Sequence, residues 1–327
     1  MEEYIKIINE ELVTRIISAQ KTPRNLYKPI EYVLESGGKR VRAVLALMAS
    51  NLYTDDISKV IGPAIGVEIF HNFTLMHDDI MDNALIRRGK ATVHKKWDNN
   101  TAILSGDAMM ILAWQYIAET EEKHLKKVID EFNKVSIEVC HGQQMDMDLE
   151  SAFFDDDMVS VPNYLEMIRL KTSVLLASSL KIGAIIGGAN ETDTETLYQI
   201  GLNIGLAFQI QDDYLDSFGD MASFGKKIGG DIIEGKKTFL TTKTKELADS
   251  FIWNDFLNTI STNSMHQDLR IQKIKELYDN VGAKAETEKT IDSYIIKAIE
   301  LLQELKIEPD KKEIFRSFIE SLQCRKK

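Results

Sequence analysis

The chain has 327 residues, and 40 Lys and Arg against 51 Asp and Glu give a net charge of −11 at pH 7. Hydrophobic residues make up 44% and charged residues 28%, a balance typical of a globular protein with a sizeable core. The acidic balance excludes a broad basic face for nucleic acid, and two cysteines, Cys140 and Cys324, exclude a disulfide framework.

Apolar residues recur at helical spacing along the chain. Within residues 5–16 and 44–52 they follow one another at three and four residues, and apolar stretches of helical character cover 67–76 and 200–210. Strict alternation and Asn-Gly or Asp-Gly hairpin turns are absent, so we predict an all-α protein with helices of 12 to 25 residues. The prolines lie near the expected helix ends, at Pro23, Pro29, Pro63, Pro162 and Pro309.

The chain carries no low-complexity linker, and the motifs described below come from both halves. We therefore predict one domain over residues 1–327, a helical bundle. The first residues lack the character of a signal peptide, and no apolar run reaches the 18 residues of a membrane span. We expect a cytoplasmic protein.

Two aspartate clusters share the pattern D-D-x-x-D. They occupy residues 78–82 and 212–216, and each follows an apolar helical stretch. On a helix the first and last carboxylates lie on nearly one face, about 6 Å apart along the axis. Carboxylates this close repel one another unless cations lie among them, and oxygen ligands favour Mg²⁺. A solvated acidic face is the alternative, which two copies of the same spacing disfavour.

Basic residues accompany both clusters. Arginine matches phosphate oxygens as a fork, lysine supplies a point charge, and a glycine-flanked helix start favours an anion. The sequence therefore predicts a cavity that binds two polyanions, one through metal and one through side chains, as chemistry on diphosphates requires. The cations are Lys39, Arg42, Arg87, Arg88, Lys171, Lys226 and Lys236.

Together these motifs resemble those of the trans-type isoprenyl diphosphate synthases, of the short-chain farnesyl and geranylgeranyl kind. The resemblance implies an all-α fold around a large central cavity and a homodimer. It also implies a magnesium-dependent transferase, a prenyltransferase that joins isopentenyl diphosphate to an allylic diphosphate. The matching segments are Gly37–Arg40, Glu68–His71, Leu75–Asn83, Arg87–Lys90, Gly142-Gln143 with Asp146, Lys171-Thr172, Phe208–Asp216, Gly225-Lys226 and Gly235–Thr238.

The resemblance further implies a role for each of these positions. Three Mg²⁺ ions would be held on the allylic diphosphate by Asp78, Asp82 and Asp212, supported by Asp79, Asp213 and Asp216. That diphosphate would be contacted by Arg87, Lys171, Gln209, Lys226 and Lys236. The diphosphate of isopentenyl diphosphate would be contacted by Lys39, Arg42, His71 and Arg88. Thr172 would face the developing carbocation, so the residues counted as catalytic are Lys171, Thr172 and Arg87.

Product length is expected to depend on the helix that precedes the first cluster. Thr74, Phe73 and Phe70 lie within an arc of about 140°, roughly 6, 7.5 and 12 Å deeper than Asp78. A bulky residue five positions before the cluster, here Phe73, resembles the short-chain enzymes and implies a C15 to C20 product. The alternatives are that Phe73 is ordinary core and that the enzyme makes longer polyprenyl chains.

Three other protein classes remain as alternatives. Two Glu-x-x-His pairs, Glu68/His71 and Glu138/His141, have the spacing of a di-iron carboxylate helix bundle, which would leave the cations unexplained. A non-catalytic subunit of a heteromeric synthase usually lacks one aspartate cluster, and both are complete here. A terpene cyclase shares one cluster but lacks cations for a second diphosphate.

Overall fold

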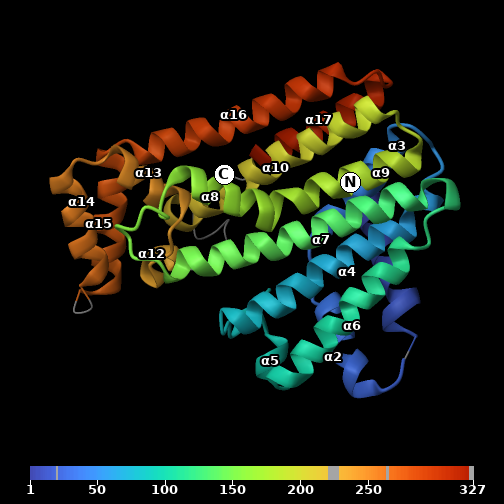
Figure 1. Ribbon diagram of the computed structural model, residues 1–327, viewed down its shortest axis with the longest axis horizontal. Helices are drawn as coiled ribbons and strands as arrows, with labels where there is room; N and C mark the ends of the chain where they lie inside the picture. Colours follow the sequence, from blue (N-terminus) through green and yellow to red (C-terminus); the bar gives the residue numbers. More distant parts are fainter. Residues whose placement is uncertain (20, 220–227, 263–264, 324–327) are drawn as a thin grey trace. The chain divides into compact units, whose positions relative to one another are not determined.

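The computed structural model describes residues 1–19, 21–219, 228–262 and 265–323 (Figure 1). In those ranges one short hairpin interrupts an otherwise helical chain, which confirms the all-α prediction. The N-terminal elements are α1 (Glu2–Leu12), η1 (Val13–Ile17), α2 (Arg24–Glu35), α3 (Val41–Asn51), α4 (Ser58–Met81), β1 (Ile86–Arg87), β2 (Lys90–Ala91), α5 (Val93–Lys96) and α6 (Asn99–Ile117). The central ones are α7 (Glu122–Ser151), α8 (Val161–Ile168), η2 (Arg169–Ser173), α9 (Val174–Gly187) and α10 (Glu191–Phe218). The C-terminal ones are α12 (Gly230–Glu234), α13 (Phe239–Leu247), α14 (Ser250–Ser261), α15 (Gln267–Asn280), α16 (Ala283–Glu304) and α17 (Pro309–Gln323).

The chain divides into two compact units, and the prediction of one domain over 1–327 stays a prediction. Unit 1 comprises Met1–Lys134, Ser178–Tyr198 and Ile307–Lys311. Unit 2 comprises Val135–Ala177, Gln199–Lys306 and Lys312–Lys327. Unit 1 contains the first aspartate cluster and unit 2 contains the second.

Unit 1 is built around α4, which packs against α3 and lies beside α6 (Figure 1). Residues 43–50 of α3 and 62–70 of α4 are buried without interruption, so both helices are covered on all sides. Helices that are apolar all round are the core elements of larger proteins. Burial of each large apolar side chain contributes about 1.5–3 kcal/mol, and this rigid core holds the C-terminal end of α4 in place.

Two helix predictions need correction. Pro29 and Pro63 lie inside α2 and α4 rather than at helix ends. Each is the sixth residue of its helix, where proline removes one early backbone hydrogen bond but leaves the rest of the helix intact. The helices also exceed the expected range, since α7 has 30 residues and α10 has 28.

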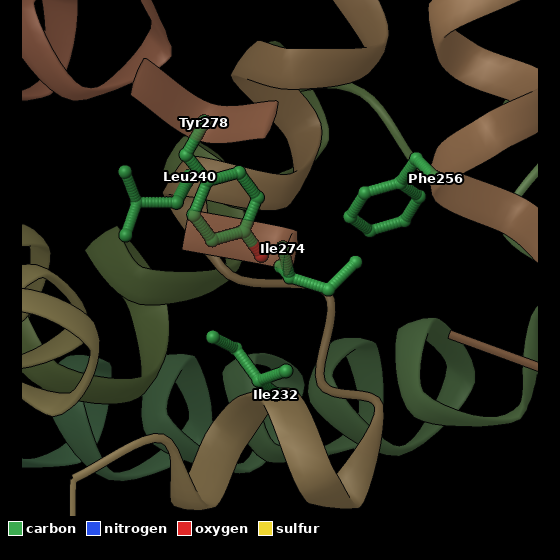
Figure 2. Close-up of a cluster of buried hydrophobic side chains, with 5 residues drawn as sticks. All are labelled: Ile232, Leu240, Phe256, Ile274 and Tyr278. Atoms are coloured by element: carbon green, nitrogen blue, oxygen red, sulfur yellow. The ribbon is translucent and has the colours of Figure 1, made fainter. Parts of the chain in front are cut away.

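Unit 2 contains a hydrophobic cluster that joins four of its helices. Figure 2 shows its five buried side chains, which come from α12, α13, α14 and α15. At its edge the hydroxyls of Tyr278 and Thr241 lie 2.9 Å apart, which ties α15 to the start of α13. The cluster therefore anchors the segment between α12 and α13, which contains Lys236. Its members are Ile232, Leu240, Phe256, Ile274 and Tyr278.

One stretch of the described chain passes a length and hydropathy test for a membrane span. Val161–Gly187 has a mean hydropathy of 1.4 over its best 18 residues, and 83% of that window is buried in the protein. Such burial is typical of a core helix. The sequence showed no apolar run of this length because charged residues, among them Arg169 and Lys171, interrupt it.

Candidate active site

The first aspartate cluster lies at the C-terminal end of α4 in unit 1. Asp82 follows the last helical residue, and its backbone N–H donates to the carbonyl of Asp78 at 2.9 Å, so the predicted helical spacing holds. Asp79 is buried, Asp78 is half-buried and Asp82 is exposed. Arg87 donates from Nε to Asp79 at 2.6 Å and from Nη2 to Asp78 at 3.2 Å. The arginine predicted to contact a diphosphate therefore bridges two of the three carboxylates.

A hairpin that the sequence did not predict presents the two arginines. β1 and β2 are antiparallel, with Arg87 opposite Lys90, and Arg88 and Gly89 form the two-residue turn between them. Both turn residues have positive φ, 52° and 74°, as in the type I′ turns that join tight hairpins. The Asn-Gly or Asp-Gly signal is absent because arginine occupies the first turn position.

The cations assigned to the second diphosphate gather near the start of α3 in unit 1. Arg42 Nη1 lies 3.0 Å from His71 Nε2, and Arg88 Nη1 donates to the carbonyl of Gly37 at 2.5 Å. A Cβ on Gly38 would lie 3.0 Å from the Arg88 guanidinium, and Gly38 has φ +128°, so only glycine fits there comfortably. Lys39 is exposed beside them. The structure thus brings together Arg42, His71 and Arg88, three of the four residues predicted to bind this diphosphate, and Lys39 lies three residues before Arg42 in the chain.

A small cleft, open to solvent, lies beside these arginines within unit 1. Its wall combines apolar side chains with the guanidinium groups and the carboxyl of Asp79. The lining residues are Tyr32, Val33, Ser36, Asn72, Leu75, Met76, Asp79, Arg87, Arg88, Ala91, Thr92 and Val93.

His71 is held neutral by its surroundings. Burial and the positive charges of Arg42 and Arg88 hold the pKa of His71 well below its usual value. Burial also lowers the pKa of Arg42 to about 10, which leaves the guanidinium charged at pH 7. The arginine therefore donates to an imidazole nitrogen that carries no proton.

This neutral histidine makes stability depend on pH. An unfolded imidazole binds a proton near pH 6.5, whereas the folded one does so only at lower pH. The folded state therefore becomes less stable relative to the unfolded state as the pH falls below about 6.5. The variant His71→Gln has no such group. When the pH falls from 7.5 to 5.5, we expect the wild type to lose more of its free energy of unfolding than His71→Gln does. The difference between the two proteins should change by at most about 1.4 kcal/mol per pH unit. Urea unfolding at both pH values measures this, and a difference that does not change with pH contradicts the burial of a neutral His71.

The second aspartate cluster lies within α10 in unit 2, and its buried members are engaged in the fold. Asp213 accepts from the Tyr164 hydroxyl at 2.5 Å and from the Phe239 backbone N–H at 3.0 Å. Burial, with the charge of Asp231, raises the pKa of Asp213 to about 7. Asp216 accepts from the backbone N–H of Asp231 at 2.9 Å. Two of the three carboxylates thus join α10 to α8, α12 and α13.

Asp212, the first aspartate of this cluster, is the half-buried one. Asp213 and Asp216, by contrast, are buried, so Asp212 is the carboxylate of the cluster that is most open to a ligand. The resemblance implied that Asp212 is the metal ligand and that the other two support it. Their burial is consistent with that division.

Lys171 and Thr172 lie in the π-helical turn η2 of unit 2. Lys171 Nζ donates to Asp146 at 2.7 Å, and the Thr172 hydroxyl donates to Gln209 Oε1 at 3.2 Å. A Cβ on Gly142 would lie 2.2 Å from the backbone nitrogen of Lys171, so glycine allows α7 to approach this turn. Single π turns are frequent at functional sites, because they alter the direction of the side chains they carry. The spacing of the sequence does not indicate this turn.

The remaining predicted lysines follow the second cluster. Lys236 lies 3.5 Å from Asp231 and 3.2 Å from Glu234, as an ion pair at the end of α12. Lys226 lies outside the residues that the structure describes, as do Cys324 and the C-terminal Arg325-Lys326-Lys327.

The two aromatic residues expected to control product length, Phe73 and Phe70, belong to an aromatic cluster in unit 1. The Phe73 ring lies 4.8 Å from His77 and 5.6 Å from Phe70, between ring centres. Phe70, fully buried, continues the aromatic cluster to Phe132 at 5.3 Å and from there to Trp114 at 5.0 Å. Phe73 is therefore a half-buried member that lies next to the fully buried Phe70.

The donor set suits magnesium. In the parts of the chain that the structure describes, no three His, Cys, Asp or Glu side chains are grouped closely enough to hold a metal ion by themselves. Magnesium usually takes one or two protein carboxylates and completes its shell with water and substrate phosphates. Asp78 at the end of α4, Asp82 directly after it, and Asp212 in α10 provide oxygen donors of this kind.

The di-iron alternative fits these contacts poorly. Glu68 Oε1 accepts from Arg40 and Asn72, and His71 Nε2 faces Arg42, so each group of that pair already has a polar partner within the protein. The sequence did not single out Asn72, and it gave Glu68 and Arg40 no role in binding a diphosphate, because polar contacts made by burial leave no spacing signal.

Comparison with known proteins decides the class. The sequence profile described as Polyprenyl synthetase matches residues 23–281. The chain belongs to the polyprenyl synthetase family. It is 41% identical over 243 residues to a short chain isoprenyl diphosphate synthase of Methanocaldococcus jannaschii, across 74% of this chain and 72% of the relative. It is 40% identical over 226 residues to a geranylgeranyl diphosphate synthase of Methanosarcina mazei, across 68% of each chain.

A solved structure supports the same conclusion. The crystal structure of geranylgeranyl pyrophosphate synthetase from Pyrococcus horikoshii Ot3 has a TM-score of 0.90 and 34% identity, over 98% of this chain and 95% of the other. This polyprenyl synthetase family member is thus a prenyl diphosphate synthase, a transferase, which closes the di-iron, cyclase and non-catalytic alternatives.

Proposed function

We propose that this polyprenyl synthetase family member extends an allylic diphosphate with isopentenyl diphosphate to a C20 trans-prenyl diphosphate, with magnesium as cofactor. The observation that carries the proposal is the division within the two aspartate clusters. In each cluster the middle aspartate is buried, whereas the first one, Asp78 or Asp212, is only half-buried and therefore more accessible to a ligand. The names of the Methanosarcina and Pyrococcus relatives support a C20 product.

On the allylic side, Asp78, Asp82 and Asp212 would hold magnesium, three ions by the resemblance, which when bound neutralises the charge of the departing diphosphate. Arg87, Lys171, Gln209, Lys226 and Lys236 would contact that diphosphate. Arg87 and Lys171 now pair with carboxylates, so the incoming diphosphate would replace Asp78 and Asp146 as their partner. Cations placed where charge develops stabilise the transition state more than the ground state.

The second substrate, isopentenyl diphosphate, would be held by Lys39, Arg42, His71 and Arg88. The allylic C–O bond breaks, which gives a carbocation and pyrophosphate. The double bond of isopentenyl diphosphate attacks that carbon to form the new C–C bond, and a proton then passes to pyrophosphate. Thr172 would face the cation, and an apolar cavity would keep water from capturing it.

Two further properties extend the proposal. A homodimer is supported by α6, where Leu104 and Ile111 lie seven residues apart on one face and are 61% and 60% exposed. We also propose that the protein acts in the cytoplasm as one domain over residues 1–327.

Phe73 is proposed as the floor of the hydrocarbon cavity, above Phe70. The Thr74 hydroxyl donates to the carbonyl of His71 at 2.8 Å, so it does not fill this space. We expect Phe73→Ala to lengthen the main product by at least one five-carbon unit, because the lost ring extends the cavity toward Phe70. Mass spectrometry of the products measures this. Phe251→Ala, which removes an 82% exposed ring, is the control, and an unchanged product in Phe73→Ala excludes Phe73 as the floor.

Separate reactions with primers of different length test the proposed product. The purified chain is incubated with Mg²⁺, isopentenyl diphosphate and a C5, C10 or C15 allylic diphosphate, and the product masses are measured by mass spectrometry. We expect all three primers to converge on a C20 diphosphate. Products of C30 or longer would show that the longer-chain alternative is correct.

A further inference from the structure

A buried carboxylate lies behind the cations assigned to isopentenyl diphosphate. Glu68, in α4, is 1% exposed. Its Oε1 accepts from Arg40 Nη1 at 3.3 Å and from Asn72 Nδ2 at 3.2 Å, while its Oε2 is buried without a hydrogen-bond partner. A buried charge is costly unless neighbouring groups compensate it, so this carboxylate is retained at a cost in stability.

Arg40 connects Glu68 to the segment that carries Lys39 and Arg42. It is buried, and besides Glu68 its guanidinium donates to the Asn9 side chain at 3.0 Å and to the Leu34 carbonyl at 2.5 Å. Its backbone has φ 49°, which is unfavourable for a residue with a side chain. Because Lys39 precedes this strained residue and Arg42 follows it by two, the anchored Arg40 fixes the direction of both cations.

Asn72 connects Glu68 to Arg88. It is fully buried, and its amide donates to Glu68 while its Oδ1 lies 3.5 Å from Arg88 Nη1. Arg88 also has positive φ, 52°, so Arg40 and Arg88 are two of the three non-glycine residues with this backbone in the described chain. Both strained positions meet in the hydrogen-bond network of one carboxylate.

The charge of Glu68 acts on the same cations. Burial lowers the pKa of both Arg42 and Arg88, and the negative charge of Glu68 opposes that effect. One buried anion therefore compensates a crowded group of guanidiniums that would otherwise repel one another.

We propose that Glu68 is the positioning residue of the isopentenyl diphosphate site, acting through Arg40 on Lys39 and Arg42, and through Asn72 on Arg88. This inference rests on the proposed function. Glu68 lies behind the guanidiniums and does not touch the substrate. Its role is to hold these three cations in the geometry that a second diphosphate requires.

Steady-state kinetics of Glu68→Gln, which keeps the shape and removes the charge, tests this role. We expect the KM for isopentenyl diphosphate to rise about tenfold and the KM for the allylic substrate to change less than about twofold. Glu131→Gln is the matched control, since Glu131 is also buried and pairs with Lys181 at 3.2 Å and with Ser178. We expect that variant to lose stability without a selective change in KM.

Arg40→Lys keeps the positive charge but cannot contact Asn9, Glu68 and Leu34 at once. This variant tests the proposal if Glu68→Gln does not fold. A selective rise in the KM for isopentenyl diphosphate in either variant supports the proposal. Equal changes for both substrates, or no change in a folded variant, overturn it. A wild-type protein that does not extend an allylic diphosphate would instead overturn the proposed function.

Discussion

Replacing Asp78 or Asp212 by alanine is expected to lower turnover by about 10³-fold or more while the protein stays folded. Each substitution removes an oxygen donor for magnesium and with it the stabilisation of the departing diphosphate. Folding should survive, because Arg87 keeps its contact with Asp79 and because Asp213 retains the bonds that join α10 to its neighbours. Removing one of several crowded carboxylates also relieves repulsion.

The measurement is kcat at saturating substrates and Mg²⁺, with circular dichroism to confirm the helical fold. Asp130→Ala is the matched control: Asp130 is an exposed helical aspartate that pairs with Lys126. It should retain wild-type turnover. Near-normal turnover in Asp78→Ala or Asp212→Ala would show that the metal assignment is wrong.

Lys171→Ala should lower kcat by about 10²-fold, because a positive charge beside the leaving diphosphate is lost from the transition state. The π turn places this lysine 2.7 Å from Asp146, a partner that the diphosphate would replace. Since that contact develops as charge accumulates on the leaving group, we expect a larger effect on kcat than on the KM for the allylic substrate.

Lys181→Ala separates this role from a structural one. The side chains of Lys171 and Lys181 are 26% and 21% exposed, and both pair with carboxylates. Because Lys181 is assigned no substrate contact, its loss should affect stability but leave kcat near the wild-type value. Equal losses of kcat in the two variants would show that Lys171 acts only through the fold.

Much of the candidate site was predictable because it depends on spacing along single helices. The D-D-x-x-D pattern at 78–82 needs only helical geometry to place its ends on one face, and the backbone bond between Asp82 and Asp78 confirms it. The Gly37-Gly38 pair before a predicted helix likewise indicated the cation-rich start of α3, which begins at Val41. Local periodicity determines such features.

The features missed by the sequence depend on tertiary contacts. The hairpin that presents Arg87 and Arg88 carries an arginine where its turn usually has Asn or Asp, so the turn signal is absent. The π turn at Lys171 requires the close approach of Gly142. The roles of Glu68 and Asn72 arise from burial beside Arg40, which no spacing reveals.

The most direct test of the account is the mass of the product that the purified protein forms from C15 allylic diphosphate and isopentenyl diphosphate. The reaction is run with Mg²⁺ and, in parallel, with excess EDTA. The account predicts a C20 diphosphate and one equivalent of pyrophosphate with Mg²⁺, and neither with EDTA. No extension with Mg²⁺, or equal extension in EDTA, would contradict it.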